Sequence, residues 1–453
     1  MIKERVMMMT KYEEIAAIIE KQIIDLEYQQ GDKLPSLKAL TKIYHCSKET
    51  AIKSYDVLIK KHLIYVKHQS GHYVADHAFK PEVMSDDYFL NTGNPIVSTT
   101  SLVDAKHCLS IAIEQYSQSS LNLSLQGVES LREILPDFLA EQGIYAKHDC
   151  VYLIQGITQM LSFLSKYAFS NKEFILIEEP TYSYYIQFLK SFHIPTLTIQ
   201  RDENGIDLYQ LEELFQTHKI KFFYIIPRNH NPLGTTLSTS TRKKIARLAM
   251  KYDVYIIEDD YFGHCSTISK YLPIHYYMEG KNCIYLTSFS KTMPYIRIGI
   301  CVIPHDFLSP FQKIMHQSYY YSYQLPSLIS QATLEAYLRS HLYQKQVQRL
   351  KKQLKHLYKV IHKVTKTWDS SLVHVIGNDS GYYLSLLIDK KIDISQLEEH
   401  LKKRKIWIAR NERCFYDLSH FNHTLRLSLA RVSQQQLAKA LTIIYQTIID
   451  IDQ

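Results

Sequence analysis

Residues 288–299 have the sequence SFSKTMPYIRIG, and this stretch decides the fold more than any other part of the chain. It follows an apolar run at 283–287 (CIYLT) that is typical of a buried strand. Two small hydroxyl residues, Ser288 and Ser290, precede Lys291. A lysine that follows a strand and small hydroxyl residues is suited to attack an aldehyde and form a Schiff base. Lys291, at the end of a predicted strand, fits this pattern.

The sequence around this stretch alternates between short apolar runs and helical patterns. The runs predicted to be strands are VYLIQ, EFILIEE, TLTIQ, KFFYIIP, DVYIIED, CIYLTSF and RIGICVIP, all between residues 151 and 304. Helical patterns separate several of them, at 158–170, 183–191, 207–217 and 239–251. Such alternation predicts an α/β fold with a mostly parallel sheet between layers of helices.

A smaller α+β part is predicted after Pro310. A long helical region at about 325–363 precedes a mixture of strand and helix patterns at about 371–450. We therefore predict one domain at 91–453, with a large subdomain at about 118–325 and a small one at about 326–453.

Five further motifs lie in a fixed order around Lys291. They are IQGITQ with Gly156, Ile157 and Thr158, EEPTYS with Tyr182, HNPLG with Asn231, EDDYFG with Asp259 and Tyr261, and LRLSLA with Arg426. Together with SFSKTMPYIRIG they resemble the class I aminotransferases of fold type I, which bind pyridoxal 5′-phosphate (PLP). Each motif alone is weak evidence, whereas six in the family order over about 270 residues are specific.

This resemblance implies a role for each motif residue. Lys291 forms the internal aldimine with PLP, and the phosphate is held by Gly156, Ile157, Thr158, Ser288, Ser290 and Arg297. Around the pyridine ring, the resemblance implies stacking by Tyr182 and hydrogen bonds to the phenolic oxygen from Asn231 and Tyr261. Asp259 pairs with the pyridine nitrogen, with Asp260 as the alternative acid. Arg426 clamps a substrate carboxylate.

Three departures from the family pattern weaken the case for a fast enzyme more than the case for cofactor binding. The stretch from Lys291 to Arg297 is one residue shorter than in relatives, which predicts a tightened phosphate loop. LNLSLQG keeps only Gly127 of a motif that includes a tyrosine in the family. No arginine lies between Arg132 and Arg201, so this region lacks a second carboxylate clamp.

The amino-terminal part of the chain is a separate basic unit. Residues 33–75 include eight lysines and two acidic residues, a formal charge of +6. Thr10 and Glu13 form a capping box that begins a helix, and Ser36 and Ser47 cap a second and a third. Two strand patterns, LIYVK and HYVA, follow around a turn at 69–71. The layout predicts a winged helix-turn-helix at 10–76, joined by a linker at 77–90.

This unit resembles the GntR-type winged helices, which bind DNA. Phosphate contacts are expected from hydroxyls and helix N-termini, and base or backbone contacts from the third helix and the wing. The candidates are Ser36, Lys38, Ser47, Lys48, Glu49, Thr50, Lys53, Lys67, His68 and His72. Positions 38 and 48, usually arginine in the family, are lysine, which offers one mobile charge instead of a planar fork. The alternative is a solvated basic face with some other partner.

Composition excludes several classes of protein. The 453 residues are 46% hydrophobic and 22% charged, which excludes wholesale disorder. Seven scattered cysteines, none spaced as CxxC, argue against a disulfide framework, and no histidine pairing predicts a metal site. No apolar run reaches the roughly 18 residues of a membrane helix, and no signal peptide is visible, so we expect a cytoplasmic protein.

A winged helix fused to an aminotransferase-like domain resembles the MocR subfamily of GntR regulators. The resemblance implies a homodimeric, PLP-dependent transcriptional regulator that senses PLP, an amine or an amino acid through Lys291. Two alternatives stay open. One is a working aminotransferase with a DNA-binding domain, and the other is a repressor whose large domain has lost the cofactor.

Overall fold

A computed structural model gives the fold of residues 10–25, 27–29, 31–61, 63–67, 70–75, 87–95, 99–116, 124–268, 270–321, 325–377 and 379–452. The chain forms two compact units, Met1–Asp86 and Asp87–Gln453. The end of the predicted linker 77–90 is not a linker, because Tyr88–Phe89 (β3) pairs in parallel with Ile406–Trp407 (β14). Leu90 is fully buried in the second unit. Residues 76–86 lie outside the described residues.

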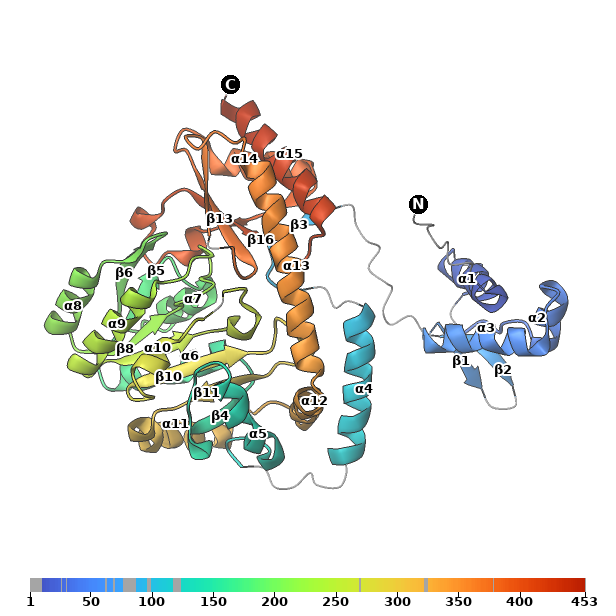
Figure 1. The fold of residues 1–453 in the computed structure, drawn as a ribbon, viewed down its shortest axis with the longest axis horizontal. Helices are drawn as coiled ribbons and strands as arrows, with labels where there is room; N and C mark the ends of the chain where they lie inside the picture. The colour runs from blue at the N-terminus through green and yellow to red at the C-terminus, as the bar shows by residue number, and fades with distance from the viewer. Residues whose placement is uncertain are drawn as a thin grey trace. The chain divides into compact units, whose positions relative to one another are not determined.

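The first unit has the predicted winged-helix architecture (Figure 1). It consists of α1 (Lys11–Ile24), α2 (Leu37–Ile43), α3 (Lys48–Lys60) and an antiparallel ribbon of β1 (Ile64–Lys67) and β2 (Gly71–Val74). The Ser36 and Ser47 side chains accept hydrogen bonds from the backbone N–H groups of Ala39 and Thr50, at 3.2 and 3.1 Å, which fixes where α2 and α3 begin. The core is made by apolar residues at helical spacing, among them Ile15, Ile19, Leu40, Tyr55 and Leu58.

An eight-stranded sheet forms the centre of the second unit. Its order is β4 (Val151–Ile154), β11 (Gly299–Val302), β10 (Cys283–Ser288), β9 (Tyr255–Asp259), β8 (Ile220–Ile225), β5 (Phe174–Glu179), β6 (Thr196–Asp202) and β7 (Gly205–Ile206). Only β11 and β7 run antiparallel to their neighbours. The predicted, mostly parallel sheet is therefore confirmed. The central strands are buried on both faces, which explains their nearly continuous apolar sequences.

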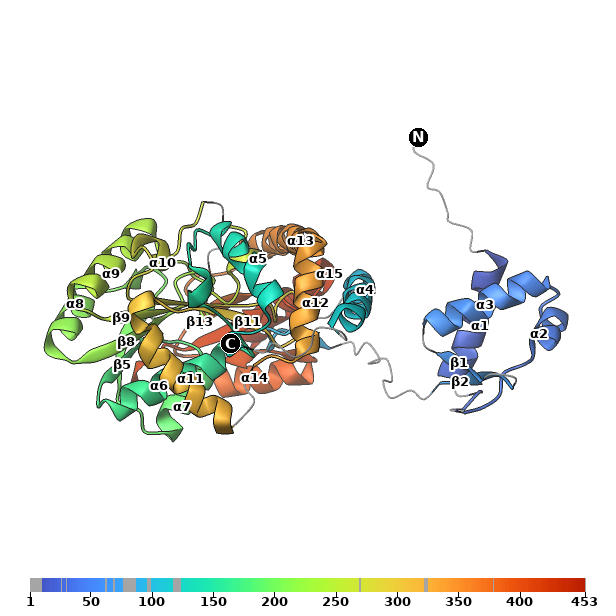
Figure 2. The same ribbon diagram turned by 90° about the horizontal axis from the view of Figure 1, so that it is seen from below.

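Helices cover both faces of this sheet (Figure 2). One face packs against α6 (Ile157–Ser170), α7 (Ser183–Ser191) and α11 (Leu308–Tyr321), and the other against α8 (Leu208–Thr217), α9 (Thr239–Lys251) and α10 (Ile274–Tyr277). Near β4, a further group packs together, consisting of α4 (Thr99–Tyr116), α5 (Glu129–Ala140) and α12 (Leu328–Arg339). Short 3₁₀ turns lie at His148–Cys150, Gly263–Cys265, His305–Phe307, Glu412–Cys414 and Leu418–His420.

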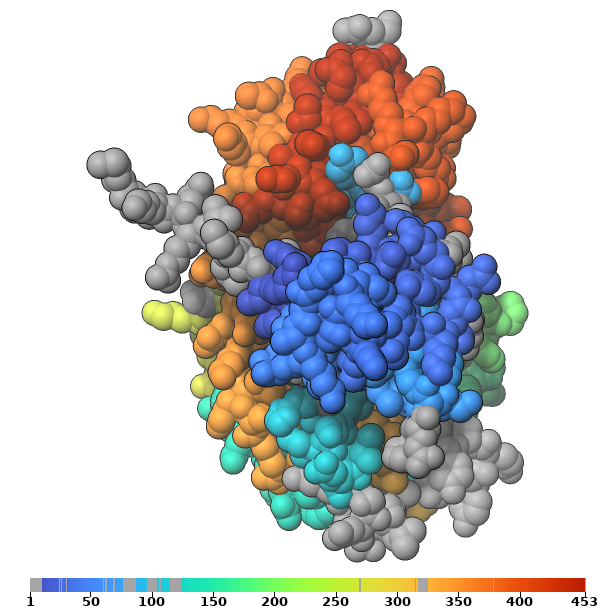
Figure 3. Space-filling view, turned by 90° about the vertical axis from the view of Figure 1, so that its right-hand side faces the viewer, coloured from blue at the N-terminus to red at the C-terminus, as the bar shows by residue number. Residues whose placement is uncertain are grey.

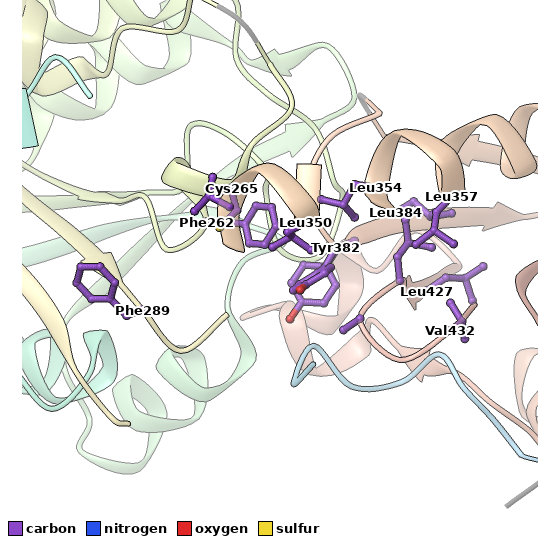
Figure 4. Packing of buried hydrophobic residues seen from close by; sticks show 14 of the residues in the cluster. Phe262, Cys265, Phe289, Leu350, Leu354, Leu357, Tyr382, Leu384, Leu427 and Val432 are labelled. Carbon is purple, nitrogen blue, oxygen red and sulfur yellow. The ribbon is translucent and has the colours of Figure 1, made fainter. Parts of the chain in front are cut away.

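A four-stranded antiparallel sheet forms the smaller part of this unit. Its order is β12 (Val373–Ile376), β13 (Tyr383–Ile388), β16 (Thr424–Ser428) and β15 (Ala409–Arg410), and it is accompanied by α14 (Ile394–Lys403) and α15 (Gln434–Asp452). The helix α13 (Leu342–Thr365) joins the two parts, because its apolar face contacts both the loop after β9 and the small sheet (Figure 4).

The predicted helical region at 325–363 is two helices and not one. His341 has a left-handed φ of 57°, which breaks the helix between α12 and α13.

The parallel strands bring the sequence motifs together. Four of them end immediately before a motif: β4 before Gly156, β5 before Tyr182, β8 before Asn231 and β10 before Lys291. A fifth, β9, ends at Asp259. Because parallel strands end at the same edge of a sheet, these residues share its carboxyl edge, where α/β proteins bind ligands.

Candidate functional site

The Lys291 amine lies at the centre of the site. Its Nζ donates a hydrogen bond of 2.9 Å to the backbone oxygen of Gly93, and it lies 5.9 Å from the centroid of the Tyr261 ring. Gly93 comes from the segment that enters the second unit, before α4. A Cβ atom on Gly93 would lie 1.8 Å from the Tyr383 Oη, so only glycine allows this segment to close against the site.

Tyr383 is a site residue that the sequence analysis did not identify. It is the first residue of β13, and the Arg426 guanidinium lies 4.6 Å from its ring centroid. Burial opposes ionisation of the Tyr383 hydroxyl, but the cationic Lys291 and Arg426 outweigh this effect and lower the pKa of Tyr383. The sequence around it, GYYLSLLI, is an ordinary strand pattern. Arg426 pairs with Ser385, two residues further along β13, in a register that the sequence does not show, so the sequence offered no signal for the contact with Tyr383.

The two adjacent acids, Asp259 and Asp260, have different environments. Asp259 accepts hydrogen bonds from the Tyr224 hydroxyl at 2.7 Å and from the Tyr261 backbone N–H at 3.1 Å. Burial raises the pKa of Asp259 to about 7, although the hydrogen bond from Tyr224 acts in the opposite direction.

Asp260 is instead engaged in a structural ion pair. Both of its carboxylate oxygens bind the buried Arg228 guanidinium, and the Tyr285 hydroxyl donates a further hydrogen bond of 2.7 Å. Asp260 is thus committed to an ion pair, whereas Asp259 makes none within the described residues, so Asp259 is the better candidate to receive a ligand.

Asn231 and Arg426 are in direct contact. Arg426 Nη1 donates to Asn231 Oδ1 at 2.9 Å, and Nη2 donates to the Asn91 backbone oxygen at 2.8 Å. Arg426 Nε is buried and has no hydrogen-bond partner among the described residues. The Tyr261 hydroxyl donates to the backbone oxygen of Asn229 at 2.7 Å. The geometry thus joins Asn231, Tyr261 and Arg426 around Lys291.

A buried ion pair supports the loop that contains Asn231. Glu178, at the end of β5, binds the Arg201 guanidinium and accepts a hydrogen bond of 2.7 Å from the Ile226 backbone N–H. Arg201 also donates to the Ile226 oxygen and to the Thr235 hydroxyl, at 3.1 and 3.2 Å. The charged groups therefore hold both ends of the 226–235 loop, a role that sequence reasoning did not assign.

Three of the predicted phosphate-binding residues, Gly156, Ile157 and Thr158, form the N-terminus of α6. The Gly156 position offers no side-chain cap to this helix, and a Cβ atom added to Gly156 would meet nothing within 4 Å. The Thr158 hydroxyl lies 3.4 Å from the Tyr182 hydroxyl. Ser288 Oγ donates to Ser290 Oγ at 3.0 Å. Arg297 is exposed and makes no hydrogen bond or ion pair with the part of the chain that the structure describes.

In the first unit, the DNA-contact candidates divide into three groups. Exposed lysines without a carboxylate partner among the described residues are Lys38, Lys48 and Lys67. Ser36, Ser47 and Thr50 lie at the beginnings of α2 and α3, and Ser47 Oγ lies 2.9 Å from Thr50 Oγ1. Glu49 and Lys53 form a 2.8 Å ion pair on the exposed side of α3.

His72 lies in β2, on the wing as predicted, but its ring faces the core of the first unit and not the solvent. Its ring packs against the Tyr55 ring, with 4.4 Å between centroids. Burial lowers the pKa of His72, so the ring is unsuited to carry a charge toward a phosphate. His68 lies outside the described residues.

Two family models match the chain. "Aminotransferase class I and II" matches residues 90–444, and "Bacterial regulatory proteins, gntR family" matches residues 11–74. The chain belongs to the MocR subfamily of GntR regulators. The chain is 30% identical to an uncharacterized HTH-type transcriptional regulator, YcxD, of Bacillus subtilis (strain 168), over 96% of this chain and 99% of that protein. It is 25% identical to the HTH-type transcriptional regulator NorG of Staphylococcus aureus (strain USA300), over 91% and 98% of the two chains.

Solved structures support the aminotransferase fold of the second unit. A multiple substrate aminotransferase from Thermococcus profundus has a TM-score of 0.73 at 21% identity, covering 82% of this chain and 93% of that one. A kynurenine aminotransferase from Pyrococcus horikoshii has a TM-score of 0.72 at 22% identity, covering 81% and 92%. At these identities the likeness shows the fold.

Membership of the class I and II aminotransferases implies PLP as the cofactor of this MocR-type chain. The described residues fit such a group. A helix N-terminus with open space at Gly156 suits a phosphate, and the buried Asp259 carboxyl suits a protonated pyridine nitrogen. The described ranges contain no cluster of potential metal ligands and no helix that is long and apolar enough to cross a membrane.

Proposed function

We propose that this protein is a PLP-dependent transcriptional regulator that binds DNA through its winged helix and senses PLP, an amine or an amino acid at Lys291. The observation that supports this proposal is the combination of a gntR unit with a site that keeps Lys291, Asp259, Asn231 and Tyr261 at one sheet edge, with Arg426 of the small sheet bound to Asn231. An amine, a carboxyl with a raised pKa and a half-buried guanidinium gathered in one region favour a functional site, because perturbed ionisable groups concentrate at such sites.

Each residue of the site has a proposed role toward the cofactor. Bound PLP supplies an aldehyde and an electron-withdrawing ring. Lys291 Nζ would bind the aldehyde carbon, Asp259 the pyridine nitrogen, and Asn231 and Tyr261 the phenolic oxygen. Tyr182 would stack on the ring. The phosphate would be bound by Gly156, Ile157, Thr158, Ser288, Ser290 and Arg297.

Arg426 would bind the carboxylate of an incoming effector. Its Nε has no hydrogen-bond partner within the described ranges, and its Nη1 donates to the Asn231 side chain, so the guanidinium is already oriented. An effector that binds Lys291 and Arg426 together would change the charge at the contact between the eight-stranded sheet and the four-stranded sheet. In a homodimer, which family resemblance implies, such a change would bias the arrangement of two DNA-binding units.

Borohydride reduction followed by peptide mass spectrometry tests the cofactor role. Wild-type protein incubated with PLP should gain a phosphopyridoxyl adduct on Lys291, and Lys291→Ala should gain none there. Lys281→Ala, an exposed lysine away from the site, is the matched control and should keep the adduct. A wild-type protein without adduct would support the alternative of a large domain that has lost its cofactor.

A working aminotransferase is a second candidate, favoured by the survival of Lys291, Asp259 and Arg426 together. It predicts complete turnover of an amino donor and a keto acid. Product formation by the wild type that is lost in Lys291→Ala would support this role, whereas adduct formation without product supports the regulator.

A further inference from the structure

The helix α13 has an extreme charge composition. Its 24 residues, LYQKQVQRLKKQLKHLYKVIHKVT, contain six lysines, one arginine and no aspartate or glutamate. The formal net charge of the whole chain is +8, and that of α13 alone is +7. The positive charge of this one helix is therefore almost equal to the net positive charge of the whole protein. Like charges three and four residues apart destabilise a helix, so this sequence is unfavourable for structure alone.

Most of these cations form one exposed row, which we call the α13 stripe. Its members are Lys345, Arg349, Lys352, Lys355, Lys359 and Lys363, all exposed and mostly three or four residues apart. The opposite face of the helix, with residues such as Val347, Leu350, Leu354 and Leu357, is buried in the core. The two faces of the helix are thus fully divided between apolar and cationic side chains.

The stripe is almost free of neutralising partners. Arg349 lies 3.7 Å from Asp104, but none of the five lysines has a carboxylate within ion-pair distance in the described part of the chain. In Figure 3 the atoms of α13, in orange, lie at the surface of the second unit beside the red atoms of α15. From Lys345 to Lys363 the row is about 27 Å long at 1.5 Å per residue, with charges about 5 Å apart.

We propose that the α13 stripe binds the phosphate backbone of duplex DNA and so adds a second, sequence-independent contact to that of the winged helix. Its length corresponds to about eight base pairs at 3.4 Å each. The inference rests on DNA binding by the first unit. DNA bound there is a polyanion tethered to the same chain as the α13 stripe. An anionic membrane fits less well, because membrane-surface helices insert an apolar face and that of α13 is buried in the core.

The test uses the full chain and measures DNA affinity as a function of salt, on duplexes of unrelated sequence of about 15 and about 60 base pairs. The stripe variant combines Lys345→Gln, Lys352→Gln, Lys359→Gln and Lys363→Gln. The control variant removes four exposed lysines elsewhere: Lys147→Gln, Lys166→Gln, Lys244→Gln and Lys390→Gln. A third variant replaces the four stripe lysines by arginine, which keeps the charge.

On the long duplex, the slope of log affinity against log salt should fall by about 3 to 4 in the stripe variant, since each lost phosphate contact releases about 0.9 fewer counterions. The control and the arginine variants should keep the wild-type slope. On the short duplex the effect should be smaller, because that DNA has less length for two contacts. Thermal melting checks that all variants fold.

Three results would overturn the proposal. They are an unchanged slope in the stripe variant, an equal fall in the control variant, or a loss of binding to phosphatidylserine vesicles with DNA binding intact. Failure of the winged helix to bind DNA is a separate outcome. In that case the double variant Lys48→Ala/Lys53→Ala keeps the wild-type slope of log affinity against log salt, whereas the stripe variant has a lower slope.

Discussion

Two neighbouring carboxyls, Asp259 and Asp260, should respond differently to the same substitution. Asp259→Asn should leave the fold intact and weaken PLP binding about 10- to 100-fold, because a charge-assisted contact is worth about 1.5–3 kcal/mol. Asp260→Asn should lower the free energy of unfolding by about 3–5 kcal/mol, because it leaves the buried Arg228 without a counter-charge. Cofactor titration and thermal melting measure the two effects. The reverse result would assign the cofactor contact to Asp260.

The raised pKa of Asp259 also predicts a pH dependence of stability. The pKa is about 7 in the folded protein and about 3.9 in an unfolded chain, so the unfolded state loses this proton first. The contribution of Asp259 to the free energy of unfolding is therefore greatest at low pH, and it falls as the pH rises from about 4 to 7. Without PLP, the wild-type melting temperature should fall more steeply than that of Asp259→Asn between pH 5 and 7.5. Parallel curves would contradict the assigned pKa.

Tyr383 should contribute to the pH dependence of the site. The cationic Lys291 and Arg426 lower the pKa of its hydroxyl against the effect of burial, so this phenol supplies negative charge to the site more readily than a free phenol. Tyr383→Phe should lower the pH midpoint of the bound-cofactor absorbance change by about 0.5–1 unit. Tyr382→Phe is the control, because its hydroxyl lies 3.5 Å from the Lys291 backbone oxygen and away from the amine. Equal shifts in both variants would exclude a specific role.

At the scale of elements, the ion pair on α3 predicts opposite effects of its two members. Glu49 holds Lys53 at 2.8 Å, so part of the positive charge of α3 is neutralised within the helix. Glu49→Gln should strengthen binding to unrelated duplex, and Lys48→Ala should weaken it and lower the salt slope by about 1. Fluorescence anisotropy at several salt concentrations measures both. Weaker binding by Glu49→Gln would instead make Glu49 a base-contacting residue.

Elements with a strong local signal were predictable from the sequence. The predicted helices at 183–191 and 239–251 coincide with α7 and α9, because apolar periodicity and the Ser238 cap define them locally. The break at His341 was not predictable, since a left-handed non-glycine residue has no reliable sequence signal. Partners distant in sequence were also missed. Glu178 with Arg201, and Tyr383 with Arg426, meet only through strand order and register.

At the scale of the whole molecule, the two compact units should unfold as separate transitions in calorimetry. PLP at about 100 times its dissociation constant stabilises the state that binds it by about 2.7 kcal/mol. For a unit of 367 residues, from Asp87 to Gln453, this corresponds to a rise in melting temperature of about 3–4 °C. In the absence of DNA, only the transition of the larger unit should rise, and Lys291→Ala should remove most of the shift. A rise of both transitions would show that the units unfold together. In that case the regulatory signal would pass through a permanent contact between the units, and not through a contact that forms only on DNA.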